Sequence, residues 1–165
     1  MTKPNFEETV KKIRDWLTEV GAFRCQMPDD NAHAHFQIEF PPGSSRLAEV
    51  IFPKPREDIV LIASGTALNK IHYDRLKAKS DRERKEILWN MRFELLFRGS
   101  DFRMIPGEED LQSIQFIRPL RFEGLTNNLF MDAIREDFRC HLYVVWTMMR
   151  LFGEAPPKSS DTMYG

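Results

Sequence analysis

The chain has 165 residues, of which 42% are hydrophobic and 30% are charged. Its 24 basic and 25 acidic side chains leave a formal net charge of -1, which excludes a strongly basic protein built to coat nucleic acid. This length and composition are typical of an ordinary soluble protein with one core. We therefore expect a single domain over residues 1–153 and a polar, disordered tail over residues 154–165.

Neither the cysteines nor the glycines form a motif that carries chemistry. Cys25 and Cys140 have no Cys-x-x-Cys spacing, so we expect two small core residues in a reduced, cytoplasmic protein. The opening segment MTKPNFEETVKK has no apolar stretch before its charges, which predicts no secretory signal. No phosphate-binding glycine loop and no nucleophile elbow is present, so neither a cofactor nor catalytic residues are predicted.

The first predicted element is an amphipathic helix over residues 6–20. Asn5 can cap its start and Gly21 can end it. Trp16 lies beside the apolar stripe and is expected at the rim of the core. The stripe itself follows a spacing of four and three residues and consists of Phe6, Val10, Ile13, Leu17 and Val20.

From residue 22 the hydrophobic period changes to two, which indicates strands. Turn signals at PDDN, PPGSS and PKPRED separate four runs. A meander of antiparallel strands is expected, with strands over residues 22–27, 33–40, 46–52 and 58–64.

The second of these strands carries the strongest candidate for chemistry. Alternation places His33, His35 and Glu39 on one face, and two imidazoles with a carboxylate can bind a divalent metal. The spacing resembles the first histidine motif of the cupin barrels. The glycines of that motif are replaced by Met27 and Arg46, and no Pro-x-Gly-x-x-His follows. We expect a solvated strand face without metal, and a metal-dependent enzyme using this trio is the alternative.

Helical patterns return after Gly65, with a short helix or helical linker over residues 66–79 and a longer helix over 80–98. Ser80 and Glu83 can form a capping box, and Gly99 ends the longer helix. That helix has two apolar stripes, so it requires two covers. One stripe is Ile87, Leu88, Met91 and Leu95, and the other is Trp89, Phe93, Leu96 and Phe97. Its basic residues mostly alternate with acidic ones, as on an exposed helix face, so a nucleic-acid partner is not expected.

Two further strands are predicted over residues 100–105 and 113–122, with Pro119 favouring an edge position or the end of regular pairing. The last element is a helix over residues 125–152, capped by Thr126 or Asn127 and ended by Gly153. From Leu142 onward it is apolar nearly all round, yet it is too short to span a membrane. It therefore needs a second cover of protein.

Two arcs of this last helix compete for the core. Leu142, Val145, Met149 and Phe152 share one arc, which we expect to face the sheet. Tyr143, Trp146 and Arg150 share the other, and aromatic side chains with arginine are enriched at interfaces. We expect a homodimer whose interface includes this second arc with Trp89 and Phe93 of the preceding helix. The alternative is a helix buried within one large core.

The order helix, four strands, helix, two strands and long helix indicates an α+β fold, with helices packed on an antiparallel sheet. The opening helix with Trp16-Leu17 and Gly21, the segment LWNMRFELLFRG and the segment FEGLTNNLFMDAIREDF resemble the type III secretion chaperone-like fold. The resemblance covers about residues 5–152 and extends to the YbjN-type and uncharacterised prokaryotic relatives of that fold.

That resemblance implies a dimer that binds other proteins and is not an enzyme. The near-neutral charge departs from the acidic secretion chaperones, so a role in secretion is not expected. The function expected from the sequence is a non-enzymatic chaperone-like or adaptor protein whose partner is another polypeptide.

Overall fold

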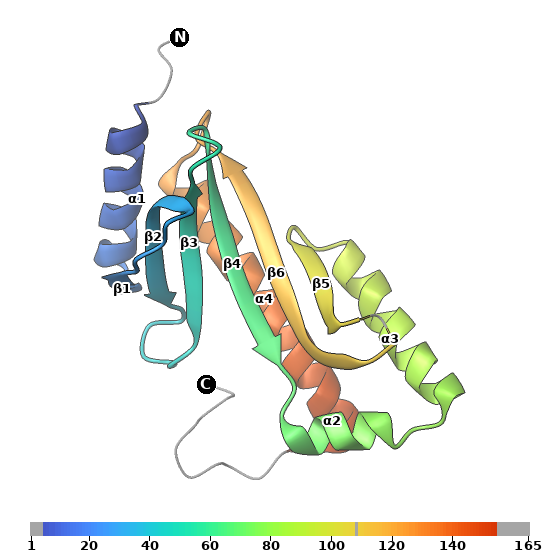
Figure 1. The fold of residues 1–165 in the computed structure, drawn as a ribbon. Helices are drawn as coiled ribbons and strands as arrows, with labels where there is room; N and C mark the ends of the chain where they lie inside the picture. Colours follow the sequence, from blue (N-terminus) through green and yellow to red (C-terminus); the bar gives the residue numbers. More distant parts are fainter. Residues whose placement is uncertain (1–4, 108, 155–165) are drawn as a thin grey trace.

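The structure is a computed structural model that describes residues 5–107 and 109–154 (Figure 1). Apart from residue 154, the predicted tail 154–165 lies outside the described residues. The described residues form ten elements: α1 (Phe6–Glu19), β1 (Phe23–Gln26), β2 (Ala32–Glu39), β3 (Leu47–Pro53), β4 (Ile59–Ala67), α2 (Lys70–Lys77), α3 (Asp81–Leu96), β5 (Asp101–Pro106), β6 (Leu111–Arg121) and α4 (Asn127–Phe152).

The predicted α+β fold is confirmed. The six strands form one antiparallel sheet in the order β1-β2-β3-β4-β6-β5, so the first four strands are the predicted meander. Strand β6 pairs with β4 from Ser113 to Arg121 and with β5 from Leu111 to Ile117. Pro119 therefore lies where β6 has a neighbour on one side only, because β5 has already ended there.

Local capping explains where the four described helices begin. The side chains of Asn5, Asn69 and Thr126 each accept a hydrogen bond from a backbone amide of the first turn of α1, α2 and α4. Ser80 and Glu83 form the predicted capping box at the start of α3. The Gly153 amide bonds to the Met149 carbonyl at the end of α4, where Gly153 adopts a φ of 80°.

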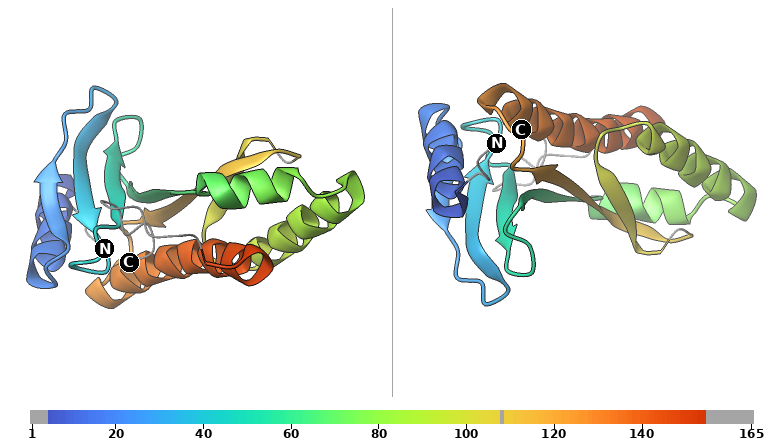
Figure 2. Two further views of the ribbon diagram at one scale, coloured as in Figure 1. Left: turned by 90° about the horizontal axis from the view of Figure 1, so that it is seen from below. Right: turned by 90° about the horizontal axis from the view of Figure 1, so that it is seen from above.

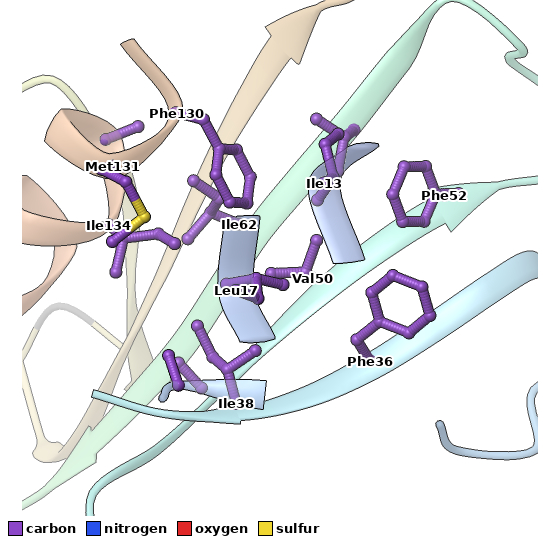
Figure 3. Packing of buried hydrophobic residues seen from close by; sticks show 14 of the residues in the cluster. Ile13, Leu17, Phe36, Ile38, Val50, Phe52, Ile62, Phe130, Met131 and Ile134 are labelled. Atoms are coloured by element: carbon purple, nitrogen blue, oxygen red, sulfur yellow. The ribbon is translucent and has the colours of Figure 1, made fainter. Parts of the chain in front are cut away.

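Helices α1 and α4 lie on the same face of the sheet, at the end formed by β1 to β4 (Figure 2). Their contact with the strands forms a first hydrophobic core, in which aromatic rings of β2 and β3 meet apolar residues of both helices (Figure 3). Phe36 and Phe52 pack edge to face with their ring centroids 5.5 Å apart. Trp16 is half-buried at the edge of this core, as predicted, with its ring centroid 5.9 Å from that of Phe130.

A second hydrophobic core lies at the other end of the sheet, where α2, α3 and the second half of α4 meet β5 and β6. It includes Leu88, Met91 and Leu95 of α3 with Val144 and Met148 of α4. The expectation of one core is therefore wrong. The two clusters are separated by polar side chains between β4 and α4, and the long helix joins both.

The prediction of which arc of α4 faces the sheet is only partly correct. Leu142 and Met149 are half-buried, because the buried face of the helix is rotated towards the neighbouring positions. At this end α4 contacts α2 as well as β4 and β6, which widens the face that is covered. From Leu142 onward the buried positions are Val144, Val145, Thr147, Met148 and Phe152.

Cys140 is buried, as expected, whereas Cys25 is exposed on β1, contrary to expectation. Strand β1 is at the edge of the sheet and contains an irregularity between residues 23 and 25, which moves its side chains out of strict alternation.

Along the described ranges, no helix combines the length and the apolarity that a membrane crossing requires.

Candidate functional site

The main candidate site is an exposed apolar stripe on α3. Trp89, Phe93, Leu96 and Phe97 are 50%, 55%, 63% and 84% exposed. Their spacing of four, three and one residues places them on one side of the helix, opposite the positions that enter the second core. We call these four residues the α3 stripe. Large apolar side chains that gather on one face, instead of scattering singly, indicate an interaction surface.

The aromatic part of the α3 stripe is held in place by stacking. The rings of Trp89 and Phe93 are 5.7 Å apart and nearly parallel. The guanidinium of Arg92 lies 3.8 Å from the centre of the Trp89 ring, which is a close cation–π contact. These contacts orient the tryptophan before any partner arrives, which reduces the conformational entropy lost on binding.

The outer face of α4 contributes a second exposed tryptophan. Trp146 is 63% exposed, and Arg150 on the same arc is also exposed. Tyr143 is half-buried instead, because it packs against the second core and its ring faces the guanidinium of Arg98 at 6.0 Å. This burial raises the pKa of the Tyr143 hydroxyl. Of the five residues predicted for an interface, Tyr143 is therefore the least accessible.

Leu96 and Phe97 were not among the predicted interface residues, yet they are the most exposed members of the α3 stripe. The signal that could have found them was present, since both lie on the second apolar stripe of the predicted helix. Helix α3 ends at Leu96, and Phe97 follows as its C-terminal cap. A residue at a helix end is less easily covered by the neighbouring layer than one in the middle.

The trio His33, His35 and Glu39 is not brought together. His33 lies 3.8 Å from the Glu57 carboxylate, whereas Nδ1 of His35 is 2.9 Å from Asp29. Glu39 is 6% exposed and binds Arg24 and the Gly43 amide. These hydrogen bonds, led by that of the amide, hold the pKa of Glu39 below its usual value.

The expectation of a solvated face on β2 is therefore wrong for Glu39 and His35, and correct only for His33. Each side chain points to a different partner on a neighbouring strand or loop. Within residues 5–107 and 109–154, no three His, Cys, Asp or Glu side chains lie close enough together to hold a metal ion. The prediction of a metal-free protein remains to be tested by elemental analysis.

The two histidines are expected to differ in their effect on stability. His33→Gln should lower the free energy of unfolding by less than about 1 kcal/mol, because the His33 side chain is 30% exposed although its ring packs edge-on against Phe6 at 4.9 Å. His35→Gln should lower it by about 1–3 kcal/mol, because His35 is 12% exposed and lies between the carboxylates of Asp29 and Glu49. Urea titration of the two single variants measures the difference, and equal effects would contradict the assignment of His35 to a structural role.

A buried ion pair lies between the two cores. Arg46, just before β3, donates from Nη2 to Asp137 of α4 at 2.7 Å, and the side chains are 9% and 2% exposed. The hydroxyl of Ser64 on β4 donates to the other carboxylate oxygen, also at 2.7 Å. Nε and Nη1 of Arg46 have no hydrogen-bond acceptor among the described residues, and the guanidinium lies over the Phe138 ring.

A second polar contact lies one turn further along α4. The Nδ1 atom of His141 is 2.9 Å from the hydroxyl of Thr66 on β4. Burial and, after it, the charge of Arg46 lower the pKa of His141 to about 4, so the imidazole is neutral at neutral pH. On the same helix, burial raises the pKa of the Cys140 thiol to about 11, which makes that thiol a poor nucleophile.

Two of three comparisons place the chain among known proteins. A family model described as "Uncharacterized conserved protein (DUF2299)" matches residues 9–148. A crystal structure of an uncharacterized protein from Methanothermobacter thermautotrophicus is similar, with 31% sequence identity and a TM-score of 0.83, over 88% of this chain and 99% of that one. A comparison with curated proteins finds no match. These relatives support the fold and name no activity.

Proposed function

Since the chain belongs to the DUF2299 family, whose description names no activity, we propose a function from the surface: a non-enzymatic, homodimeric protein that binds another polypeptide. The observation that carries this proposal is the exposure of the α3 stripe together with Trp146. In the proposed dimer, these residues of one protomer face the same surface of a second copy.

The apolar area that these two helices expose is close to what a stable dimer requires. Phe and Trp side chains each offer about 150–250 Å² when fully exposed, so the α3 stripe and Trp146 present on the order of 600 Å² of apolar surface. A standard interface covers about 800 Å² on each partner, including its polar rim. The exposed arginines Arg139 and Arg150 are available for such a rim.

The composition of the surface also supports a protein partner. Tryptophan, phenylalanine and arginine are enriched where binding energy is concentrated. The resemblance to the type III secretion chaperone-like fold implies the same class of function, a dimer that binds other proteins. The buried polar residues bond to one another between β4 and α4, which is consistent with a structural role for them.

The proposed homodimer is tested with glutamate substitutions at exposed apolar residues inside and outside the proposed interface. Leu96→Glu places a charge in the α3 stripe and should raise the dimer dissociation constant by about tenfold or more. Trp146→Glu should have the same effect through α4. Light scattering coupled to size-exclusion chromatography should give twice the chain mass of 19.4 kDa for the wild type and a lower average mass for both variants.

The matched control is Leu129→Glu. Leu129 is 54% exposed near the start of α4 and is not part of the α3 stripe, so this variant should remain a dimer. Circular dichroism checks that all three variants keep the helical content of the wild type. A wild-type protein that is monomeric at micromolar concentration contradicts the proposed dimer, and so does an equal loss of mass in Leu129→Glu.

A further inference from the structure

The open face of the sheet is hollowed opposite the middle of α4. The groove has a volume of about 470 Å³ and lies over β2, β3, β4 and β6. Backbone pairing places Gln37, Glu49, Ala63 and Ile117 side by side in one row across these strands. Since neighbouring strands are about 4.8 Å apart, the groove is about 14 Å wide from the first to the last of them.

Small residues at the centre of the sheet create the hollow. Ala63 and Gly65 lie on β4, between the larger side chains of Leu47 and Ile51 on β3 and of Ile117 on β6. A Cβ atom added at Gly65 would meet nothing within 4 Å, so the space above this residue is open. Leu47 and Ile117 are 47% and 43% exposed, which leaves apolar surface facing solvent in the middle of a sheet.

Polar residues at the two ends of the groove and on β3 match the groups of a peptide. Gln37 at one end and Gln115 at the other each carry a carboxamide, which offers donors and an acceptor, as a peptide group does. Glu49 is the charged residue of the lining, and its side chain is 43% exposed although Oε1 lies 3.2 Å from Nε2 of His35. A cationic side chain is the complement of this carboxylate.

We propose that this groove binds an extended segment of the partner polypeptide, with an apolar side chain over Ala63 and Gly65 and a lysine or arginine beside Glu49. About four extended residues, at roughly 3.3 Å each, match the width of the groove. This inference rests on the proposed function and names the surface that serves it. The α3 stripe is then used by the second copy, and the open sheet face by the partner.

The test is a selection of random short peptides displayed on phage, with the wild-type protein as the target. The selected peptides should share an apolar residue next to a lysine or arginine. For synthetic copies measured by fluorescence anisotropy, Gly65→Leu should raise the dissociation constant by about tenfold or more, because it fills the hollow. Glu49→Gln should raise the dissociation constant of peptides with the basic residue by about tenfold. It should not change the dissociation constant of peptide copies in which glutamine replaces that basic residue.

The matched control is Ala67→Leu, which adds similar bulk to the same strand outside the groove. Ala67 is exposed at the end of β4, so binding should be unchanged. Thermal unfolding followed by circular dichroism shows whether Gly65→Leu remains folded. If it does not, Gln37→Ala and Gln115→Ala supply the decisive comparison, and unchanged binding in both overturns the proposal.

The other outcomes separate this inference from the proposed function. In one outcome, Leu96→Glu abolishes peptide binding and Gly65→Leu does not. That result places the polypeptide site on the α3 stripe. It overturns the proposed groove site, and the proposed function of polypeptide binding stands. Enrichment of peptides without a basic residue overturns the role of Glu49. If the selection enriches no peptide above background, the proposed peptide site in the groove is overturned. Such a result also removes the support for a polypeptide partner.

Discussion

Asp137→Ala is expected to lower the free energy of unfolding by about 3–5 kcal/mol. The substitution leaves the Arg46 guanidinium buried with neither its carboxylate partner nor access to water, since the Arg46 side chain is only 9% exposed. It also removes the acceptor of the Ser64 hydroxyl. Urea titration followed by circular dichroism measures the loss.

The control for this prediction lies on the same helix. Asp132 pairs with Arg135 at 2.9 Å on the exposed side of α4, so Asp132→Ala should cost less than about 1 kcal/mol. A double variant that combines Arg46→Met with Asp137→Ala should be more stable than Asp137→Ala alone, because the unpaired charge is gone. Equal losses for Asp132→Ala and Asp137→Ala would show that the buried pair is not held as described.

The second large effect expected is a dependence of stability on pH that is caused by His141. Its pKa in the folded protein is about 4, below the ordinary value of 6.5. Between pH 4 and pH 6.5, His141 is therefore mostly protonated in the unfolded chain and mostly neutral in the folded protein. Stability should be at its full value above pH 6.5 and fall as the pH drops to 4, by up to about 3 kcal/mol from this residue.

The measurement compares unfolding free energies at pH 7 and pH 4.5 for the wild type and His141→Gln. The variant loses the Thr66 contact at both pH values, but its stability should fall less between them. His33→Gln, which alters a partly exposed histidine, should keep the dependence of the wild type. The same decrease in His141→Gln as in the wild type would mean that other groups cause the acid sensitivity.

The elements of this protein could be predicted from sequence because their signals are local. The capping box of Ser80 and Glu83 acts within one helical turn, and both apolar stripes of α3 are visible in the residue spacing. The alternation of β2 likewise separates the buried Phe36 from the outward His35. For the candidate site, local spacing was enough to place Trp89 on an uncovered face.

Contacts between residues far apart in the chain were decided by the tertiary structure alone. Arg46 and Asp137 are 91 positions apart, and they meet because α4 packs against the sheet where the two cores adjoin. The groove depends in the same way on β6 lying beside β4, which places Ile117 next to Ala63. The type and order of the elements were predictable from the sequence, through backbone preferences and hydrophobic period, although residues 66–67 were expected in a helix and instead end β4. Which faces are covered followed only from the order of the strands, because burial depends on neighbours that no local pattern identifies.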